Sequence, residues 1–376
     1  MLSEEQDHFQ ATAHALAHRE LASGAAQRDY DEEFPHDAFR SMAKAGLMGI
    51  MVDPEFDGAG GDYVSFTQVI AEIAYADGAA STVLQVHNGL VCMSVQNFGS
   101  LAQKNQFLRP LAMGDQLGCF CLTEPEAGSD VAAIQMRAKR HGSRFILNGS
   151  KQFITSGKTA DIAIVFAVTD KSKGKKGISA FIVPTATEGF RVARIERTMG
   201  QRSTDHCHLV LEDCEVPAAN LLGEEGDGLK IALSGLAGGR LGVAAQALGM
   251  ARSAYDRALS YAKDRRAFGK PIIEHQAVGF RLAEMATQIQ AAELMIWRAA
   301  SLRDQNGECL KEASMAKLFA TEMAERVCHD ALQTLGGYGY LADFELERIY
   351  RDVRVCEIYE GTSDIQKLVI SRIIAQ

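Results

Sequence analysis

Glu360 is a carboxylate that the sequence places on a loop. It lies in the segment 358–363, Ile-Tyr-Glu-Gly-Thr-Ser, which indicates a loop followed directly by the start of a helix. The N-terminus of a helix carries a partial positive charge and stabilises a nearby anion. The segment therefore predicts a carboxylate held on a loop, although a Glu before a capped helix is also an ordinary structural feature.

Three further segments combine side chains suited to a flat polar ring and to phosphate groups. In 121–130 a strand ends at a Pro turn, where small residues expose backbone amides and where Thr123 and Ser129 offer hydroxyls. Segment 153–157 ends another strand with an aromatic and a hydroxyl side chain on one face, and 264–270 closes a helix with a cationic cluster. Each also has a purely structural interpretation, but their occurrence in one chain favours a shared ligand site.

Other motifs do not meet the requirements of the sites they resemble. Gly157-Lys158-Thr159 lacks the glycine that a P-loop needs five residues earlier, because Gln152 stands there. No G-x-G-x-x-G follows a strand, so a Rossmann nicotinamide site is unsupported. The pairs Cys119/Cys121 and Cys207/Cys214 do not have the spacing of a zinc site, and burial on strands explains them equally well. No metal is predicted.

Composition excludes several classes of protein. There are 48 acidic and 39 basic residues, which gives a formal net charge of −9 and disfavours nucleic acid and anionic membranes as partners. The longest lysine cluster, 171–176, is interpreted as a solvated turn. The longest uncharged stretch, 78–103, is too polar for a membrane span. No secretory signal is recognised, and the 8 cysteines are expected to be reduced, so we expect a cytoplasmic protein or a processed protein of the mitochondrial matrix.

The period of the apolar residues changes twice along the chain and divides it into three parts. Residues 1–116 follow the helical period, 117–222 follow the period of two that is typical of strands, and 223–376 return to long helical stripes. The predicted class is therefore α+β, with an N-terminal helical domain, a middle β domain and a C-terminal bundle. Ser363-x-x-Gln366 predicts a capping box at the start of the last helix.

On these motifs the chain resembles the flavin-dependent acyl-CoA dehydrogenases nearly from end to end. The most specific segments are 122–130, 265–269, 333–339 and 359–362. The resemblance implies an N-terminal helical domain, a middle β-barrel or sandwich-like domain and a C-terminal four-helix bundle. It also implies FAD bound between domains, a homotetramer, an acyl-CoA substrate and an electron-transferring flavoprotein as the electron acceptor.

The resemblance assigns roles to individual residues, and Glu360 takes the position of the catalytic base. The residues assigned to FAD are Leu122, Thr123, Ser129, Phe153, Thr155, Arg265, Phe268, Gln276, Gln333, Gly336, Gly337, Thr362 and Asp364. The residues assigned to the acyl-CoA are Val86, Leu90, Ser129, Arg240, Tyr359 and Gly361, with His87 among the expected determinants of pocket depth. Arg265 is expected to act across a subunit boundary.

The implied reaction removes the α-proton of an acyl-CoA thioester and transfers the β-hydrogen as hydride to flavin N5. Desolvation is expected to raise the pKa of Glu360 toward that of the proton it accepts. Some relatives place the base on the first long C-terminal helix, but Gly239 stands at that position here. Ala237 replaces an Asp that relatives commonly use toward CoA, and the Leu-x-Gly-Gly-Arg pattern ending at Arg240 is similar to that of isobutyryl-CoA dehydrogenases.

Three functions are compatible with these observations. The leading one is dehydrogenation of a short-to-medium or short branched acyl-CoA, in fatty-acid or branched-chain amino-acid catabolism. The second is an acyl-CoA oxidase that reacts directly with oxygen, although such enzymes tend to be longer than these 376 residues. The third is a non-catalytic binding or scaffold protein of the same fold, against which the presence of Glu360, Thr155 and Arg265 argues.

Overall fold

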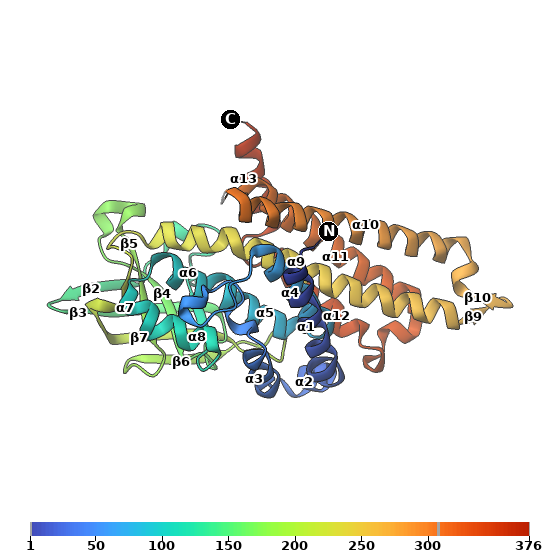
Figure 1. Ribbon diagram of the computed structural model, residues 1–376, viewed down its shortest axis with the longest axis horizontal. Coiled ribbons are helices and arrows are strands. Elements are labelled where there is room, and N and C mark those ends of the chain that lie inside the picture. The colour runs from blue at the N-terminus through green and yellow to red at the C-terminus, as the bar shows by residue number, and fades with distance from the viewer. Residues whose placement is uncertain (1, 307–308, 376) are drawn as a thin grey trace.

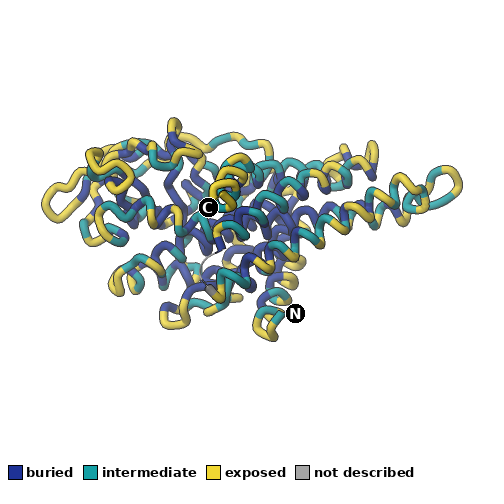
Figure 2. Tube along the Cα trace, turned by 90° about the horizontal axis from the view of Figure 1, so that it is seen from above, coloured by how far each residue is buried: buried dark blue, intermediate teal, exposed yellow. Residues whose placement is uncertain are grey.

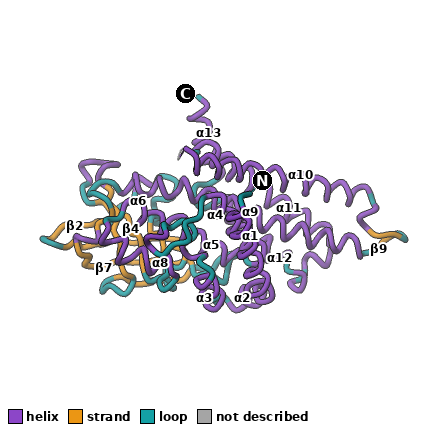
Figure 3. The backbone as a smooth tube through the Cα atoms, in the orientation of Figure 1, coloured by secondary structure: helices purple, strands orange, loops and turns teal. Residues whose placement is uncertain are grey.

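The structure is a computed structural model that describes residues 2–306 and 309–375. Strands gather at one end of an elongated molecule and long helices extend to the other (Figures 1 and 3). Exposed segments concentrate at the two ends of the long axis, and buried segments concentrate in the middle (Figure 2). The N-terminal helices are α1 (Glu4–Leu16), α2 (Ala25–Asp31), α3 (His36–Lys44), α4 (Tyr63–Ala76), α5 (Gly78–Gln85), α6 (Met93–Phe98), α7 (Leu101–Gln103) and α8 (Arg109–Met113).

The middle of the chain forms one eight-stranded sheet. The strands run in the order β6-β7-β3-β2-β4-β5-β8, and β1 pairs with β4 in parallel. The apolar run Ile162–Val168 is β4, which is buried on both faces as its composition predicts. The strands are β1 (Gly118–Cys121), β2 (Arg137–His141), β3 (Arg144–Thr155), β4 (Ile162–Val168), β5 (Ile178–Pro184), β6 (Phe190–Ile195), β7 (His206–Pro217) and β8 (Leu221–Leu222).

The C-terminal part is a bundle of long helices with a small hairpin at its tip. The helix α11 (Leu310–Leu335) ends directly before Gly336, which has φ of 59°, as the pair Gly336-Gly337 predicts. The elements are α9 (Gly228–Asp264), β9 (Arg266–Ala267), β10 (Lys270–Pro271), α10 (Gln276–Asn306), α11 (Leu310–Leu335), α12 (Leu346–Val353) and α13 (Ser363–Ile374). The predicted fold class is confirmed, and the short α12 is an element that the sequence did not predict.

The helix α9 joins all three parts of the chain. Its first turns, at Ile231 and Ala232, pack in one apolar cluster with Ile178 and Ile182 of β5. Its middle, from Leu241 to Ala262, packs with α4 and α11 in the largest cluster. By length and composition α9 is apolar enough to cross a membrane, but 78% of its most apolar stretch is buried inside the fold, which is typical of a core helix.

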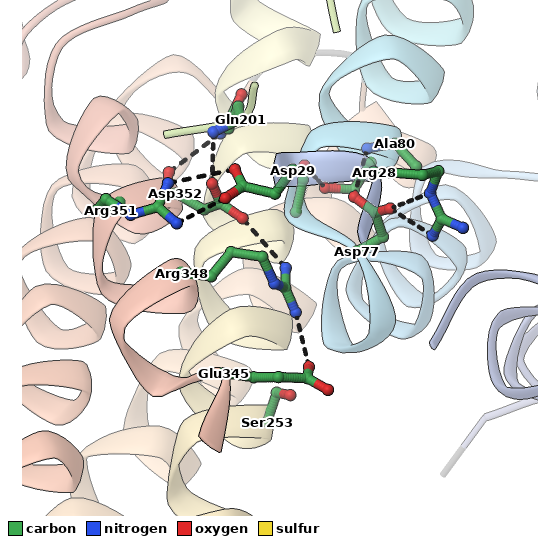
Figure 4. Close-up of polar contacts among 12 residues, drawn as sticks. Arg28, Asp29, Asp77, Ala80, Gln201, Ser253, Glu345, Arg348, Arg351 and Asp352 are labelled. Carbon is green, nitrogen blue, oxygen red and sulfur yellow. Dashed lines mark hydrogen bonds and ion pairs between the residues drawn. The ribbon is translucent and has the colours of Figure 1, made fainter. Parts of the chain in front are cut away.

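A network of buried ion pairs connects α12 to the N-terminal helices (Figure 4). Arg348 donates to Asp352 at 3.2 Å and to Glu345 at 3.1 Å, and both Arg348 and Asp352 are buried. Arg351 pairs with Asp29 of α2 at 2.6 Å. Asp352 also accepts a hydrogen bond from the backbone N–H of Gln201, in the segment between β6 and β7. The network therefore links three separate regions of the sequence.

We expect Asp352→Ala to destabilise the fold by about 3–5 kcal/mol, because it leaves Arg348 buried beside fewer negative charges. The matched control is Glu212→Ala, which removes the partner of Arg191 from an ion pair that is 53% and 66% exposed and should cost no more than about 1 kcal/mol. Equilibrium unfolding in urea measures both values. Equal costs for the two variants would show that the buried network contributes no more than a surface pair.

Candidate active site

Glu360 lies in a sharply turned loop between α12 and α13. Glu360 has φ of 52° and Gly361 has φ of 93°, so two successive residues adopt the left-handed conformation. This conformation is unfavourable for a non-glycine residue and persists where the surroundings enforce it. The double turn brings the side chain of Glu360 back toward α9.

The carboxylate of Glu360 lies against α9 at Gly239. A Cβ built at Gly239 would be 1.8 Å from Glu360 Oε2, so the carboxylate occupies the space that a side chain at position 239 would fill. Gln85, at the end of α5, donates from Nε2 to Glu360 Oε1 and, at 3.3 Å, to the carbonyl of Gly239. Within residues 2–306 and 309–375, Glu360 Oε2 is buried and has no hydrogen-bond partner. One carboxylate oxygen is held and the other is available to accept a proton.

The environment of Glu360 shifts its titration toward neutral pH. Burial raises the pKa of Glu360 to about 7, although the hydrogen bond from Gln85 and the positive charges of Lys317 and Arg240 oppose the shift. A carboxyl group with this pKa exchanges a proton readily near pH 7, which is the property required of a general base.

Two buried donors fix the backbone on the C-terminal side of Glu360. Lys317 of α11, which is fully buried, donates from Nζ to the carbonyl of Gly361 at 2.9 Å. Gln366 Nε2 donates to the same carbonyl at 2.8 Å and to that of Glu360 at 3.3 Å. The predicted capping box is therefore wrong: Thr362, whose hydroxyl accepts from Ile365 N, caps α13, and Gln366 holds the loop instead.

Arg240 follows Gly239 on α9 and is buried near Glu360. Its Nε and Nη1 have no hydrogen-bond partner among the residues that the structure describes. Burial lowers the pKa of Arg240 and the negative charge of Glu360 opposes this shift, but an arginine remains charged. A buried cation with unpaired donors is costly unless an acceptor binds there, so this position favours a polar ligand beside Glu360.

The hydroxyl of Tyr359 lies in a polar cluster with Thr82, Gln201 and Gln246. Its hydroxyl donates to Gln246 Oε1 and lies 3.5 Å from Thr82 Oγ1. Gln201 Nε2 donates to the same hydroxyl at 3.4 Å, which joins the cluster to the ion-pair network of Figure 4. Burial raises the pKa of Tyr359 well above its usual value, so the phenol stays neutral.

An apolar wall connects the N-terminal helices with the sheet. Val86 and Leu90, which were predicted to contact the substrate, are buried in one cluster with Leu122 and Phe120 at the end of β1. His87 does not have the predicted role: its Nδ1 accepts from Gly118 N at 3.1 Å, and its Nε2 lies 3.0 Å from the carbonyl of Leu111. Burial lowers the pKa of His87 to about 4, so this histidine is a neutral structural link.

The strand ends predicted to contact a flat ring lie side by side. The N–H of Gln152 donates to the carbonyl of Thr123 at 2.9 Å, which brings the two segments together. Phe153 has φ of 59° and a side chain that is 66% exposed, an unusual state for a large aromatic at the end of a strand. Thr155 Oγ1 lies 3.4 Å from His206 Nδ1.

The loop after Thr123 is anchored by a buried ion pair. Lys151, which is fully buried, donates to Glu124 at 2.7 Å and to the carbonyl of Leu122 at 3.0 Å. Glu124 also accepts from the backbone N–H groups of Gln135, at 2.6 Å, and Met136, at 3.0 Å. These four bonds hold both ends of the loop, and Ser129 lies exposed in its middle.

The remaining residues predicted for FAD lie in two places, at the tip of the bundle near the hairpin β9–β10 and at the start of α13. Arg265, Gln333, Gly336 and Gly337 line a cavity of about 460 Å³, where the Arg265 guanidinium lies 5.8 Å from the centre of the Tyr338 ring. Phe268, on the hairpin β9–β10, is 94% exposed, and Gln276 at the start of α10 is also exposed. Thr362 and the exposed Asp364 lie at the start of α13.

The predicted FAD residues therefore form separate groups in one chain. The residues in β3 and directly after β1 lie at the sheet end of the molecule, whereas Arg265 and Gln333 lie toward the hairpin β9–β10 at the opposite end (Figure 1). In the described part of the chain, no group of three or more His, Cys, Asp or Glu residues could hold a metal ion.

Comparison with known proteins identifies the family. The models of the acyl-CoA dehydrogenase N-terminal, middle and C-terminal domains match residues 3–115, 119–214 and 226–375. The chain belongs to the acyl-CoA dehydrogenase family. A mitochondrial short-chain specific acyl-CoA dehydrogenase of Mus musculus is 43% identical over 370 residues, which cover 98% of this chain and 90% of that protein.

Solved structures of acyl-CoA dehydrogenase architecture superpose closely on the whole chain. The butyryl-CoA dehydrogenase of Megasphaera elsdenii has a TM-score of 0.98 at 39% identity and covers 100% of this chain and 99% of its own. A chain from a study of the electron transferring flavoprotein of Acidaminococcus fermentans has a TM-score of 0.99 at 42% identity, with 100% and 99% covered. The protein is thus an FAD-dependent oxidoreductase.

The residues present fit FAD. The exposed rings of Phe153 and Phe268 and the cavity beside Gly336 and Gly337 are apolar or open surfaces that a bound flavin nucleotide would cover. A Cβ built at Gly337 would meet no atom within 4 Å, so the backbone there is open to close approach by a ligand. Arg265 supplies the positive charge that a diphosphate requires.

Sequence reasoning missed the residues that hold Glu360 in place. Gln85, Lys317 and Gln366 each occupy a helix, where their residue types are common. One signal was present for Lys317: it lies on the same helical stripe as Ala313, Ala316 and Ala320, all of which are buried. A lysine at such a position is rarely buried without a specific partner.

A double-mutant cycle tests the contact between Glu360 and Gly239. We expect Gly239→Ala to cost about 1–3 kcal/mol in the native protein, because the added methyl group overlaps the carboxylate. In the Glu360→Ala background the same change should be neutral or should stabilise the helix by up to about 1 kcal/mol. Urea unfolding of the four FAD-loaded proteins gives the coupling energy, and an equal effect in both backgrounds would contradict the proposed position of the carboxylate.

Proposed function

We propose that the protein catalyses FAD-dependent α,β-dehydrogenation of a short-chain acyl-CoA, with Glu360 as the base that removes the α-proton. The observation that carries the proposal is the state of Glu360: a buried carboxylate with one unpaired oxygen, a pKa of about 7, and a position beside Arg240. The relatives named short-chain specific and the butyryl-CoA dehydrogenase support the substrate class.

The residues around Glu360 provide what proton abstraction next to a thioester requires. Burial keeps water from stabilising the carboxylate, so it is a stronger base than an exposed Glu. Gln85 holds Oε1, which leaves Oε2 directed to the proton. The unpaired donors of Arg240 are available for acceptor oxygens of the substrate. Bound FAD supplies the acceptor for the hydride, and Phe153, Thr123 and Thr155 are the residues that would orient it.

The space next to α9 favours a short acyl chain. One helical turn beyond Gly239, a Cβ built at Gly242 would lie 2.4 Å from Gln85 Cγ and 3.1 Å from the ring of Phe66. Gln85 and Phe66 therefore pack closely against α9 one turn beyond Gly239, which supports a short acyl group. Short linear and short branched acyl groups both meet this limit.

A homotetramer and an electron-transferring flavoprotein partner complete the proposal. The residues predicted for FAD lie at opposite ends of one chain, which supports a site shared between subunits (Figure 1). The structural match from the study of the Acidaminococcus fermentans electron transferring flavoprotein supports that class of acceptor. Relatives in bacteria and in mitochondria support a cytoplasmic or matrix location.

Anaerobic titration with acyl-CoAs tests the proposed function. Butyryl-CoA and isobutyryl-CoA should bleach the flavin absorbance of the purified protein, and palmitoyl-CoA should not. Glu360→Gln should retain FAD and lose the rate of bleaching by at least roughly three orders of magnitude, because an amide accepts no proton. Unchanged flavin reduction in Glu360→Gln would exclude Glu360 as the base, and no bleaching with any acyl-CoA would exclude the dehydrogenase activity.

The pKa of Glu360 predicts how activity depends on pH. The carboxylate is the active form and its pKa is raised to about 7. The value of kcat/KM should therefore increase with pH between 6 and 8 and have its midpoint near 7, whereas an unperturbed Glu would already be ionised at pH 6. Stopped-flow reduction at saturating FAD measures the profile. A rate independent of pH in this range would contradict the role of burial.

A further inference from the structure

A histidine to which no function has been assigned lies beside Thr155. His206 begins β7 and pairs in register with Thr155, the last residue of β3, so the two side chains share a face of the sheet. The Nδ1 atom of His206 lies 3.4 Å from Thr155 Oγ1. Within residues 2–306 and 309–375, that hydroxyl is the only hydrogen-bond partner of the imidazole. The imidazole therefore interacts with a residue that the proposed function places against the flavin.

The two strand ends around this pair have unused hydrogen-bonding capacity. The paired side chains are half-buried, at the end of β3 where Phe153 is exposed. The hydroxyls of Ser156 and Thr204, one and two residues from the pair, are buried and have no hydrogen-bond partner in the described part of the chain. The segments stay together there, because Ser156 N donates to the carbonyl of Asp205 at 2.8 Å. Buried hydroxyls are rarely left without a partner, so this place fits a polar ring bound against it.

Among the described residues, no carboxylate forms a hydrogen bond with the imidazole. The carboxylate of Asp205, directly before His206, accepts instead from the backbone and a hydroxyl of the turn 158–159, at 2.8 and 2.5 Å. Glu196, whose N–H donates to the carbonyl of His206, accepts from Gln152 Nε2 at 2.8 Å. Burial lowers the pKa of His206, and the charge of Asp205 only partly opposes the shift, so the imidazole is neutral at pH 7.

A neutral imidazole either accepts or donates at Nδ1, depending on which ring nitrogen carries the proton. When Nδ1 of His206 accepts, it takes the hydroxyl proton of Thr155 as a hydrogen bond, and the oxygen of Thr155 faces a ligand as an acceptor. When Nδ1 donates, the hydroxyl proton is free and Thr155 faces the ligand as a donor. His206 therefore allows Thr155 to take either role without leaving a buried proton unpaired.

A flavin requires both roles from a hydroxyl beside its N5 atom. In the oxidised ring N5 carries a lone pair and accepts a hydrogen bond, whereas in the reduced ring N5 bears a hydrogen and donates one. A hydroxyl that accepts from reduced N5 needs a second acceptor for its own proton. Nδ1 of His206 is such an acceptor, at 3.4 Å from Thr155 Oγ1.

We propose that His206 is a positioning residue that accepts the hydroxyl proton of Thr155 when the bound flavin is reduced, and that it thereby stabilises reduced FAD. The inference rests on the proposed function for the place of Thr155, and it adds a residue that sets the reduction potential. Without the imidazole, the reduced state leaves the proton of Thr155 buried and unpaired, whereas the oxidised state loses only one accepted hydrogen bond. The unpaired donor costs more, so removal of the imidazole should lower the reduction potential.

The test measures the reduction potential of the FAD-loaded protein at pH 8, by equilibration with a reference dye during light-driven reduction. His206→Phe retains a planar ring and removes both nitrogens. We expect it to shift the equilibrium toward oxidised FAD by roughly tenfold, which is about 30 mV for a two-electron couple. His206→Leu, which is smaller, should give the same shift and replaces His206→Phe where that variant does not fold. His206→Asn keeps a group that accepts or donates near the position of Nδ1, and should retain a potential close to the native value.

Two controls separate this role from a structural one. Thr155→Val removes the hydroxyl, so the addition of His206→Phe in that background should shift the potential no further. His208→Phe makes the same change two residues along β7 and on the same face, where the register partner is Arg194 of β6. It should leave the reduction potential unchanged.

Equal potentials for the native protein and His206→Phe would overturn the proposal. A shift in His206→Asn as large as that in His206→Phe would also overturn it, as would a full shift in the Thr155→Val background. Light-driven reduction needs no acyl-CoA, so these comparisons decide the role of His206 independently of turnover. Absence of bleaching with every thioester would instead refute the proposed dehydrogenase activity.

Discussion

The site depends on keeping one carboxylate out of water and against a helix backbone. Removing a carboxylate from water is unfavourable, and the protein offsets this cost with one hydrogen bond from Gln85 and the nearby charges of Lys317 and Arg240. The offset is incomplete, so the pKa remains high. A fully paired Glu360 would be a stable anion and a weak base, which means that incomplete stabilisation is the basis of its reactivity.

Four helices, α5, α9, α11 and α13, supply the residues that hold this carboxylate and the backbone next to it. Gly239 belongs to α9, Gln85 to α5, Lys317 to α11 and Gln366 to α13, and each contacts Glu360 or the backbone next to it. The left-handed turn at Glu360 is retained because these contacts surround it. Precise placement of the base is thus a property of the assembled bundle and not of the short loop alone.

The sequence predicts the fold better than it predicts the contacts that hold the side chain of Glu360. The strand 162–168 and the stop at Gly336 follow from local composition, whereas the role of Glu360 as the base is assigned from the resemblance to the family and stays a prediction. The roles of Gln85 and Lys317 could not be predicted, because they depend on which helices cross near the loop. His87 and Ser363 do not have their predicted roles: tertiary contacts make His87 a structural link, and the local contact between Ile365 N and Thr362 Oγ1 places the cap of α13 at Thr362.

Helix α9 connects the sheet to the N-terminal and C-terminal helices through apolar packing. Its 37 residues contribute to the apolar interior beneath the sheet at one end and between α4 and α11 at the other. The face of the sheet that carries Phe145 and Leu209 has an apolar cluster made of middle-segment residues, whereas the opposite face and the N-terminal helices share their apolar clusters with α9. A protease that cuts at the connection near Gly114 or near Gly226 would therefore produce fragments that remain associated, because α9 stays packed against both the sheet and the N-terminal helices.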